Sequence, residues 1–191
     1  MVTDPHVHFH RNWGLKGVAE YDPQTAKWSV HGHVWLKGAA INGRIPTSFD
    51  VVTGRMDISV ANISSLEGCP RKCDILDARN NPLLSLAHVP QCRQLHIQYC
   101  YDLNNLEHMP ALDLLHISWY PHLPMLRCLM AQQVKITTGA YSLILEDVLN
   151  DPKWAGKGKL GVLNCALEMK KRGQMVTEPG GENPFLQNAR W

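Results

Sequence analysis

The residues that decide the fold run from Leu66 to Pro110 and read LEGCPRKCDILDARNNPLLSLAHVPQCRQLHIQYCYDLNNLEHMP. A leucine recurs every 20 residues, and a proline follows four residues after each of the first three leucines. The two registers are Leu66, Leu86, Leu106 and Leu126, and Pro70, Pro90 and Pro110. A sequence that repeats with a period of roughly 20 to 50 residues is typical of a solenoid, in which each repeat forms one coil. The sequence therefore predicts a stack of short coils.

Each period also contains two apolar residues separated by one other residue. The pairs are Val34 and Leu36, Met56 and Ile58, Leu76 and Ala78, Leu95 and Ile97, Leu115 and Ile117, and Val134 and Ile136. Because side chains alternate between the two faces of a strand, both residues of a pair should point inward and the residue between them to solvent. One coil cannot bury its apolar face alone, so the strands are expected to stack into a parallel sheet.

The bend after each strand carries a residue with a predicted structural role. These residues include Asn81, Cys100 and Tyr120. An asparagine turned inward at a bend can hydrogen-bond backbone groups that would otherwise lack partners. The proline after each leucine restricts the return segment to an extended or turn conformation. We expect about five full or partial coils, which together span residues 34–139.

The segments that flank the repeats are suited to covering the ends of the stack. Residues 27–36 alternate apolar and polar side chains as strands do, and Asp22-Pro23 marks a turn. We therefore expect an N-terminal β cap over residues 1–33. On the C-terminal side, helical spacing in residues 141–149 and 160–172 predicts a helical cap over residues 140–175.

The second of these helices has a predicted apolar face and a predicted end. Leu160, Leu163 and Leu167 share the face, and Gly173 is expected to stop the helix. Residues 176–191 are rich in proline, glycine and polar residues and should form a loosely packed tail. The predicted fold class is an α/β solenoid with a parallel β-sheet, an N-terminal β cap and a C-terminal helical cap.

Composition narrows the function classes. The net charge of +2 comes from 19 basic and 17 acidic residues that are interspersed, so the chain has no electrostatic footprint for nucleic acid. It contains neither an apolar stretch of about 18 residues nor a secretory leader, which predicts no membrane contact and a cytoplasmic location. The six cysteines include no CxxC pair, and we expect them to be reduced.

The segment from Val34 to Ile136 resembles the short leucine-rich-repeat proteins encoded by bacteriophages and some bacteria. The matching phrases are SSLEGCP at residues 64–70, SLAHVP at 85–90 and NLEHMP at 105–110. The N-terminal start of that family is matched by Ile45-Pro46, Phe49, Val52 and Gly54. The resemblance covers a little over half of the chain, and it implies a leucine-rich-repeat fold and a phage origin but no common activity. Cys100 and Tyr120 depart from the family, which usually has asparagine at this position.

A different resemblance lies at the N-terminus, where residues 4–10 read DPHVHFH. This phrase resembles the opening metal motif of the amidohydrolases. Alternate histidines on a strand would place His6, His8 and His10 on one face, as in a zinc or nickel site. That family needs a barrel of roughly 200 residues or more, and the repeats occupy the space where its strands would follow. We expect no metal, no cofactor and no catalytic residues, and keep a metal-dependent hydrolase as an alternative.

The residues between the paired apolar positions are the strongest candidates for a binding site, because a solenoid displays them in rows on its concave face. They combine aromatic residues and arginine, which supply much of the energy of protein interfaces, with polar neighbours that set specificity. The predicted partner-binding residues are Trp35, Asp57, Asp77, Arg79, His96, Gln98, His116, Ser118 and Trp119.

The function predicted from these observations is a non-catalytic protein–protein interaction module. The phage resemblance implies that it binds and blocks a host protein, such as a defence protein, although a viral protein could equally be the partner. A structural or assembly component of a virion or oligomer, which makes its contacts through the caps or the tail, is a further alternative.

Overall fold

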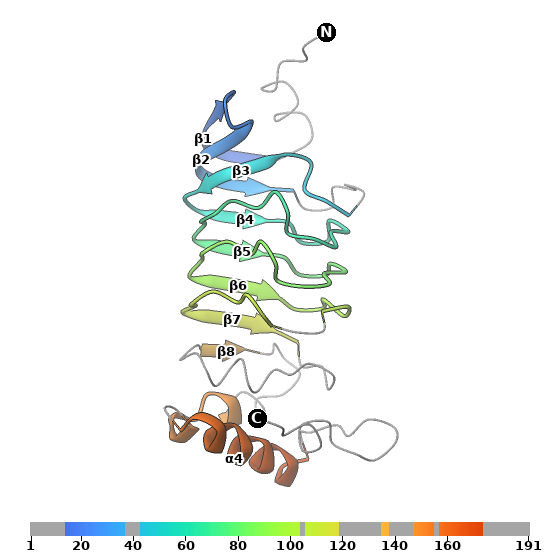
Figure 1. Ribbon diagram of the computed structural model, residues 1–191, viewed down its shortest axis with the longest axis vertical. Coiled ribbons are helices and arrows are strands. Elements are labelled where there is room, and N and C mark those ends of the chain that lie inside the picture. Colours follow the sequence, from blue (N-terminus) through green and yellow to red (C-terminus); the bar gives the residue numbers. More distant parts are fainter. Residues whose placement is uncertain are drawn as a thin grey trace.

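The computed structural model describes residues 14–36, 43–103, 106–118, 135–137, 147–154 and 157–173. Within these residues the chain forms a solenoid-like stack of about 4 turns built mostly of parallel strands (Figure 1). One sheet contains β1 (Gly14–Asp22), β2 (Lys27–Trp35), β3 (Ser48–Val52), β4 (Arg55–Asp57), β5 (Ile75–Asp77), β6 (Gln94–Ile97), β7 (Leu114–Ile117) and β8 (Lys135–Thr137).

The predicted strand positions form the core of the stack. Strands β2 and β4 to β8 pair in parallel, and their register aligns one apolar residue from each coil in a single column. The column consists of Val34, Met56, Leu76, Leu95, Leu115 and Ile136, and each of these side chains is at most 1% exposed. The second residue of five pairs, from Leu36 to Ile117, is buried in the same way. The predicted parallel sheet is therefore confirmed.

The recurring leucines begin the tight turns that return the chain to the next strand. The N–H groups of Cys69, Val89 and Met109 donate to the carbonyl groups of Leu66, Leu86 and Leu106. The third residue of each turn has a positive φ, namely Gly68 (94°), His88 (65°) and His108 (68°). A turn with positive φ at its third residue is type II, and it favours glycine at that position. The 20-residue period thus reflects one such turn per coil.

Asn81 holds neighbouring coils together as the sequence predicted. Its Oδ1 accepts hydrogen bonds from the N–H groups of Ala61 (3.1 Å) and Ile63 (3.0 Å) in the preceding coil. Its Nδ2 donates to the carbonyl groups of Ile58 (2.8 Å) and Ala78 (3.0 Å). At the equivalent place in the next coil the Cys100 thiol donates to the carbonyl groups of Ala78 (3.2 Å) and, at 4.0 Å, Gln98. One buried side chain therefore satisfies backbone groups from two coils.

An antiparallel hairpin occupies one end of the sheet. Strands β1 and β2 pair along their whole length, from Gly14 opposite Trp35 to Asp22 opposite Lys27. The turn between them begins at Asp22, whose carboxylate accepts hydrogen bonds from the backbone of Gln24 and the hydroxyl of Thr25. Strand β2 also pairs with β3 through its first half and with β4 through its second half, so it joins the hairpin to the stack.

The last coil has a different register from the one predicted. In β8 Ile136 lies opposite Leu115, and Thr137 lies opposite His116. The prediction that Val134 and Ile136 form the inward pair is therefore wrong by two residues, because Ile136 occupies the first position of the pair. Val134 itself lies outside the described residues. Period counting misplaced this strand because the spacing between paired residues varies from 19 to 21 along β4 to β8.

The C-terminal helix was predicted correctly, but its buried face was not. Helix α4 (Gly158–Lys171) lies beyond β8 (Figure 1) and follows the short 3₁₀ helix η1 (Pro152–Trp154). Gly173, with φ 66°, follows its C-cap residue Arg172. Leu160 and Leu167 are 61% and 43% exposed, whereas Cys165 and Met169 are fully buried. The core therefore contacts the face that carries Cys165 and Met169. Among the described residues no helix has the length and apolar character needed to cross a membrane.

Candidate binding site on the ladder face

The residues between the paired apolar positions form one continuous row across the sheet. The register places Trp35 opposite Asp57, Asp57 opposite Asp77, and Asp77 opposite His96. The row continues through His116 to Thr137. We call this row the ladder, and the sheet face that carries it the ladder face; its members are Trp35, Asp57, Asp77, His96, His116 and Thr137. The sequence pattern identified the first five and missed Thr137.

Two ladder residues are buried, although the pattern predicted that they point to solvent. The side chains of Asp57 and Asp77 are 9% and 0% exposed, whereas those of Arg55 and Arg79 are 30% and 39% exposed. Arg55 contacts both carboxylates through Nη2, and Arg79 donates to Asp77 from Nε (2.8 Å) and Nη2 (2.7 Å). The two guanidinium groups therefore lie above the carboxylates and shield them from water.

The charge of Asp77 is maintained despite its burial. Burial alone raises the pKa of the Asp77 carboxyl, but the hydrogen bonds and charge of Arg79 and the charge of Arg55 together lower it below its ordinary value. Asp57 accepts further hydrogen bonds from the backbone N–H (3.0 Å) and the hydroxyl (2.6 Å) of Ser59. Asp57, Asp77, Arg55 and Arg79 therefore form one connected network of ion pairs on this part of the ladder face.

The next residues along the ladder are two histidines in contact. The rings of His96 and His116 meet edge to face with centroids 4.2 Å apart, and His116 shares a hydrogen bond with the hydroxyl of Thr137. Burial, followed by the neighbouring His116, lowers the pKa of His96 to about 4. His96 is therefore neutral at physiological pH, with one ring nitrogen as donor and the other as acceptor.

Three buried polar atoms around Asp77 have no hydrogen-bond partner among the described residues. They are Nε of Arg55, Nε2 of His96 and Oε1 of Gln98. Arg55 contacts Asp77 directly, and His96 lies opposite Asp77 in the sheet. Gln98 is the neighbour of Arg79 in the next coil, because its carbonyl accepts from the N–H of Asn80. Buried polar groups are nearly always paired in folded proteins, so a group of three unpaired atoms marks this as an unusual place on the molecule.

The strands end in residues with strained backbone and exposed apolar side chains. Val60, Asn80 and Tyr99 occupy equivalent places in three coils, and their φ angles are 56°, 55° and 63°. Val60 is 52% exposed, and Tyr101 is 64% exposed with its ring 6.4 Å from that of Tyr99. A β-branched residue is costly in the left-handed region, whereas asparagine adopts it readily. We call Val60, Tyr99 and Tyr101 the strand-end edge.

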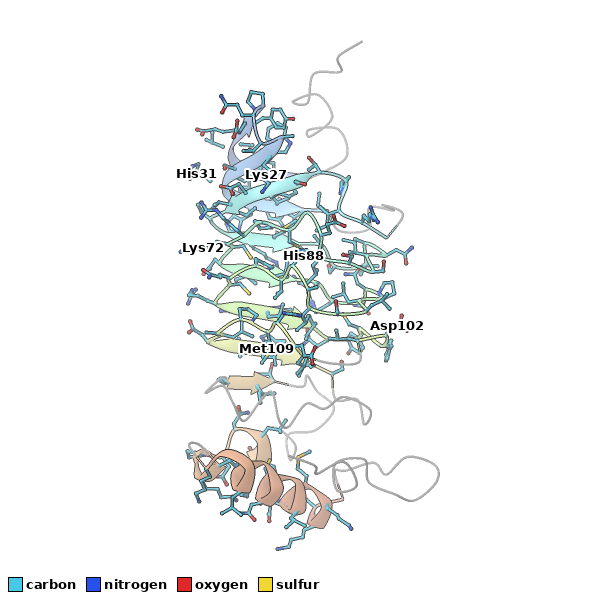
Figure 2. The ribbon with its side chains drawn as sticks, viewed as in Figure 1. Lys27, His31, Lys72, His88, Asp102 and Met109 are labelled. Atoms are coloured by element: carbon cyan, nitrogen blue, oxygen red, sulfur yellow. The ribbon has the colours of Figure 1, made fainter. Side chains whose placement is uncertain are left out.

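The opposite side of the stack is different in kind. Figure 2 shows Lys72 on the side where the strands begin and Asp102 on the side where they end. On the side of Lys72 two arginines form exposed ion pairs between coils, Arg71 with Asp50 (3.0 Å) and Arg93 with Asp74 (2.6 Å). Exposed pairs of this kind contribute little to stability because water and salt screen them.

The predicted site residues are partly brought together. Asp57, Asp77, Arg79, His96 and Gln98 form the charged centre of the ladder face. Trp35 lies at the end nearest the hairpin, where its ring stacks on His33 with centroids 5.8 Å apart. At the other end Ser118 accepts a hydrogen bond from the N–H of Tyr99 (3.1 Å). Trp119 lies outside the described residues, as do His6, His8 and His10.

Sequence reasoning missed Arg55 and the strand-end edge. Arg55 occupies the position before the inward pair, where the other coils have Ile75, Gln94 and Leu114. The available signal was a charged residue at a position that is apolar in two of the three other coils. The positive φ of Val60 leaves no trace in the sequence, because valine gives no sign of a left-handed turn.

The described thiols and acidic groups offer no evident metal site. Among the residues that the structure describes, no group of three or more His, Cys, Asp or Glu side chains is arranged to hold a metal ion. A hydrogen bond with Cys92, together with burial, raises the pKa of the Cys73 thiol, and burial raises that of Cys100 to about 11. Both thiols are therefore protonated at neutral pH, which makes them poor nucleophiles.

Comparison of the chain with models of protein families, with curated proteins and with solved structures gave no significant match. The features of the ladder face are therefore the main indication of function.

Proposed function

We propose that this protein is a non-catalytic binding module that docks on a partner protein through its ladder face. The observation that carries the proposal is the cluster around Asp77. There, two partly exposed guanidinium groups lie over buried carboxylates, and three buried polar atoms of Arg55, His96 and Gln98 have no hydrogen-bond partner among the described residues. Arginine and tyrosine are the residue types that most often dominate the energy of protein interfaces. Arg79 lies close enough to Tyr99 of the strand-end edge for the two side chains to interact electrostatically.

The rigidity of the cluster favours binding. Arg79 is held by two hydrogen bonds to one carboxylate, and Arg55 bridges the carboxylates of two coils. Side chains that are already ordered lose little conformational entropy when a partner arrives, so more of the contact energy appears as affinity. The parallel pairing of β4 with β5 and of β5 with β6 also holds the spacing of the cluster constant.

The chemistry of the cluster indicates what the partner presents. The carboxylates lie underneath and the guanidinium groups outside, so the outer layer consists mainly of hydrogen-bond donors. The complementary surface is a segment rich in carboxylate or carbonyl acceptors, flanked by an apolar side chain that packs on Tyr101 and Val60. Arginine recognises such acceptors with paired, directional hydrogen bonds.

Two finer points belong to the same proposal. We infer that the β1–β2 hairpin and helix α4 act as caps that shield the ends of a leucine-rich-repeat array, because terminal coils otherwise expose their apolar faces. We also infer that the partner is a host protein which is blocked by occlusion, in the cytoplasm of a phage-infected cell. This last inference is supported by the family resemblance of residues 34–136 alone.

The test uses two arginines that each pair with an aspartate, Arg79 with Asp77 in its own coil and Arg71 with Asp50 in the neighbouring coil. The tagged protein first captures its partner from a lysate of its native cell, and the affinity of the purified pair is then measured. Arg79→Gln keeps a hydrogen bond to Asp77 but removes the guanidinium group, and we expect it to weaken binding at least tenfold. Arg71→Gln, on the other side of the stack, is the control and should change the affinity less than about twofold.

The alternatives predict other outcomes of the same experiment. If the folded Arg79→Gln variant and the unaltered chain bind the partner with equal affinity, the ladder face is excluded as the binding surface. Loss of binding only after deletion of residues 176–191 would assign the contact to the tail. Loss of a measured hydrolysis after replacing His6, His8 and His10 with alanine would support the enzyme hypothesis instead.

A further inference from the structure

Strand β1 is the first strand in the order of the sheet, and its outer edge is open among the described residues. The strand order begins at β1, which pairs with β2 on one side and with no other described strand on its outer side. Figure 1 shows it at the end of the stack, far from α4. An edge strand presents a row of unpaired N–H and C=O groups that can accept another strand. At 9 residues, β1 matches β2 as the longest strand in the described part of the chain.

The two faces of β1 have different chemistry. Leu15, Ala19 and Tyr21 are partly buried and pack on the core, whereas Lys16, Val18 and Glu20 are exposed. Val18 is 61% exposed. Neither Lys16 nor Glu20 forms an ion pair with any described residue. The exposed face of the edge thus carries an apolar residue between two unpaired opposite charges.

This pattern is self-complementary when the strand is reversed. Val18 is the midpoint of β1, so an antiparallel copy centred there would pair all of Gly14–Asp22. Lys16 of each copy would then lie opposite Glu20 of the other, and Val18 opposite Val18. On the inner face Leu15 would lie opposite Tyr21. Opposite charges and apolar–aromatic pairs directly across an antiparallel pair are favourable, whereas like charges are not.

We propose that two copies of this chain associate through antiparallel pairing of their β1 strands about a twofold axis at Val18. The pairing joins the two sheets into one and satisfies the open edge of each. A twofold interface needs a surface complementary to itself, and β1 meets that requirement on both of its faces. The inference does not depend on the ladder, whose members include none of these residues.

The dimer is expected to be weak. An interface made by a single strand from each copy is small compared with those of stable dimers, so association should appear only at high protein concentration. Charged residues on an edge strand can also serve to prevent pairing. Preventing strand pairing requires only that the edge is charged, whereas the proposed pairing requires Lys16 and Glu20 to have opposite charges.

The experiment measures mass by sedimentation equilibrium from roughly 1 μM to roughly 1 mM protein. The unaltered chain should change from monomer to dimer. Lys16→Glu places Glu opposite Glu twice in each dimer, and Glu20→Lys places Lys opposite Lys twice. Each variant alone should raise the dimer dissociation constant at least tenfold. An equimolar mixture of the two variants restores both ion pairs, so it should form a heterodimer about as strong as the original.

The controls distinguish this edge from any other contact. Lys72→Glu makes the same charge change on the repeats and should leave the dissociation constant unchanged. All of these sites are exposed, so circular dichroism should show every variant folded. Monomers at every concentration would overturn the proposal. So would a dimer that ignores both charge reversals, or variants whose mixture stays monomeric.

Discussion

At the scale of single residues, Asp77 shows how one buried charge organises a surface. It lies between Arg55 and Arg79, and both guanidinium groups are partly exposed because the carboxylate beneath holds them in place. Removing one partner of a buried ion pair is far more costly than removing an exposed pair. Substitution of Asp77 would therefore test folding rather than binding, which is why Arg79 is the better site for a binding experiment.

Val60 and Asn80 provide a reciprocal test of backbone strain. Both residues have a left-handed backbone at equivalent places in adjacent coils. Val60→Asn should raise the free energy of unfolding by about 1 kcal/mol, because asparagine tolerates this conformation and valine does not. Asn80→Val should lower it by a similar amount. Urea unfolding followed by circular dichroism measures both, and changes of equal sign would contradict the explanation.

His96 should make stability depend on pH. Its pKa is about 4 in the folded chain against 6.5 for the free side chain, so the unfolded chain binds a proton more readily between these values. The stability contributed by neutral His96 is complete above pH 6.5 and is lost as the pH falls towards 4. Because water reaches part of the ring, we expect a loss of about 1–2 kcal/mol.

The matching variant separates His96 from the carboxylates. Asp74 and Asp77, whose pKa values are lowered in the folded chain, also contribute stability that is lost as the pH falls. His96→Gln removes only the histidine contribution, so unfolding curves at pH 7 and pH 4.5 should differ less in this variant than in the unaltered chain. An identical difference in the two proteins would show that His96 titrates normally.

Residue-level features were only partly predictable from the sequence. The alternation of LxL placed Trp35, Asp57, Asp77, His96 and His116 in one row, and the register confirms that row. Alternation gives the direction in which a side chain leaves the strand, but not what covers it afterwards. Arg55 covers Asp57 and Asp77 from a position that the pattern treated as ordinary. Burial at the ladder therefore required the three-dimensional structure.

At the scale of elements, the hairpin depends on two facing glycines. Gly17 and Gly32 lie opposite each other with φ angles of 130° and 148°. A Cβ on Gly32 would lie 1.9 Å from the carbonyl oxygen of Lys16 and 2.9 Å from Cα of Gly17. Only glycine occupies this backbone region without a large cost in free energy. The two strands can come this close because neither residue has a side chain.

Gly32→Ala should separate β1 from β2. We expect a loss of about 2 kcal/mol or more and faster hydrogen exchange in residues 14–35, with the coils beyond β4 remaining protected. Gly173→Ala is the control, because Gly173 also has a positive φ but a Cβ there meets nothing within 4 Å. It should cost only about 1 kcal/mol. Equal effects would show that strain alone, and not the collision, decides the outcome.

How well each element was predicted depended on how regular its sequence pattern is. The coils from β4 to β7 repeat with nearly constant length and were placed correctly. The position of α4 was predicted, but its leucines were assigned to the core because apolar spacing cannot tell which face contacts the sheet. β3 was not predicted as a strand, since SFDVV alternates only weakly.

At the scale of the whole molecule, the stack is nearly one-dimensional. Each strand from β4 to β7 pairs only with its two neighbours, so stability is largely a sum of coils and their interfaces. The ladder and the outer edge of β1 involve different residues of this sheet. One can hold a partner while the other holds a second copy of the chain.

The measurement that tests the binding account most directly is photo-cross-linking from two matched glutamines. In one variant a diazirine side chain replaces Gln98 on the ladder face. In the other it replaces Gln91, an exposed residue on the side of the stack where the strands begin. If the ladder face is the binding surface, the partner should become covalently attached to the side chain at position 98 and not to the one at position 91 under the same illumination. Attachment from position 91 with none from position 98, in variants that bind the partner equally, would contradict the assignment of the ladder face as the binding surface.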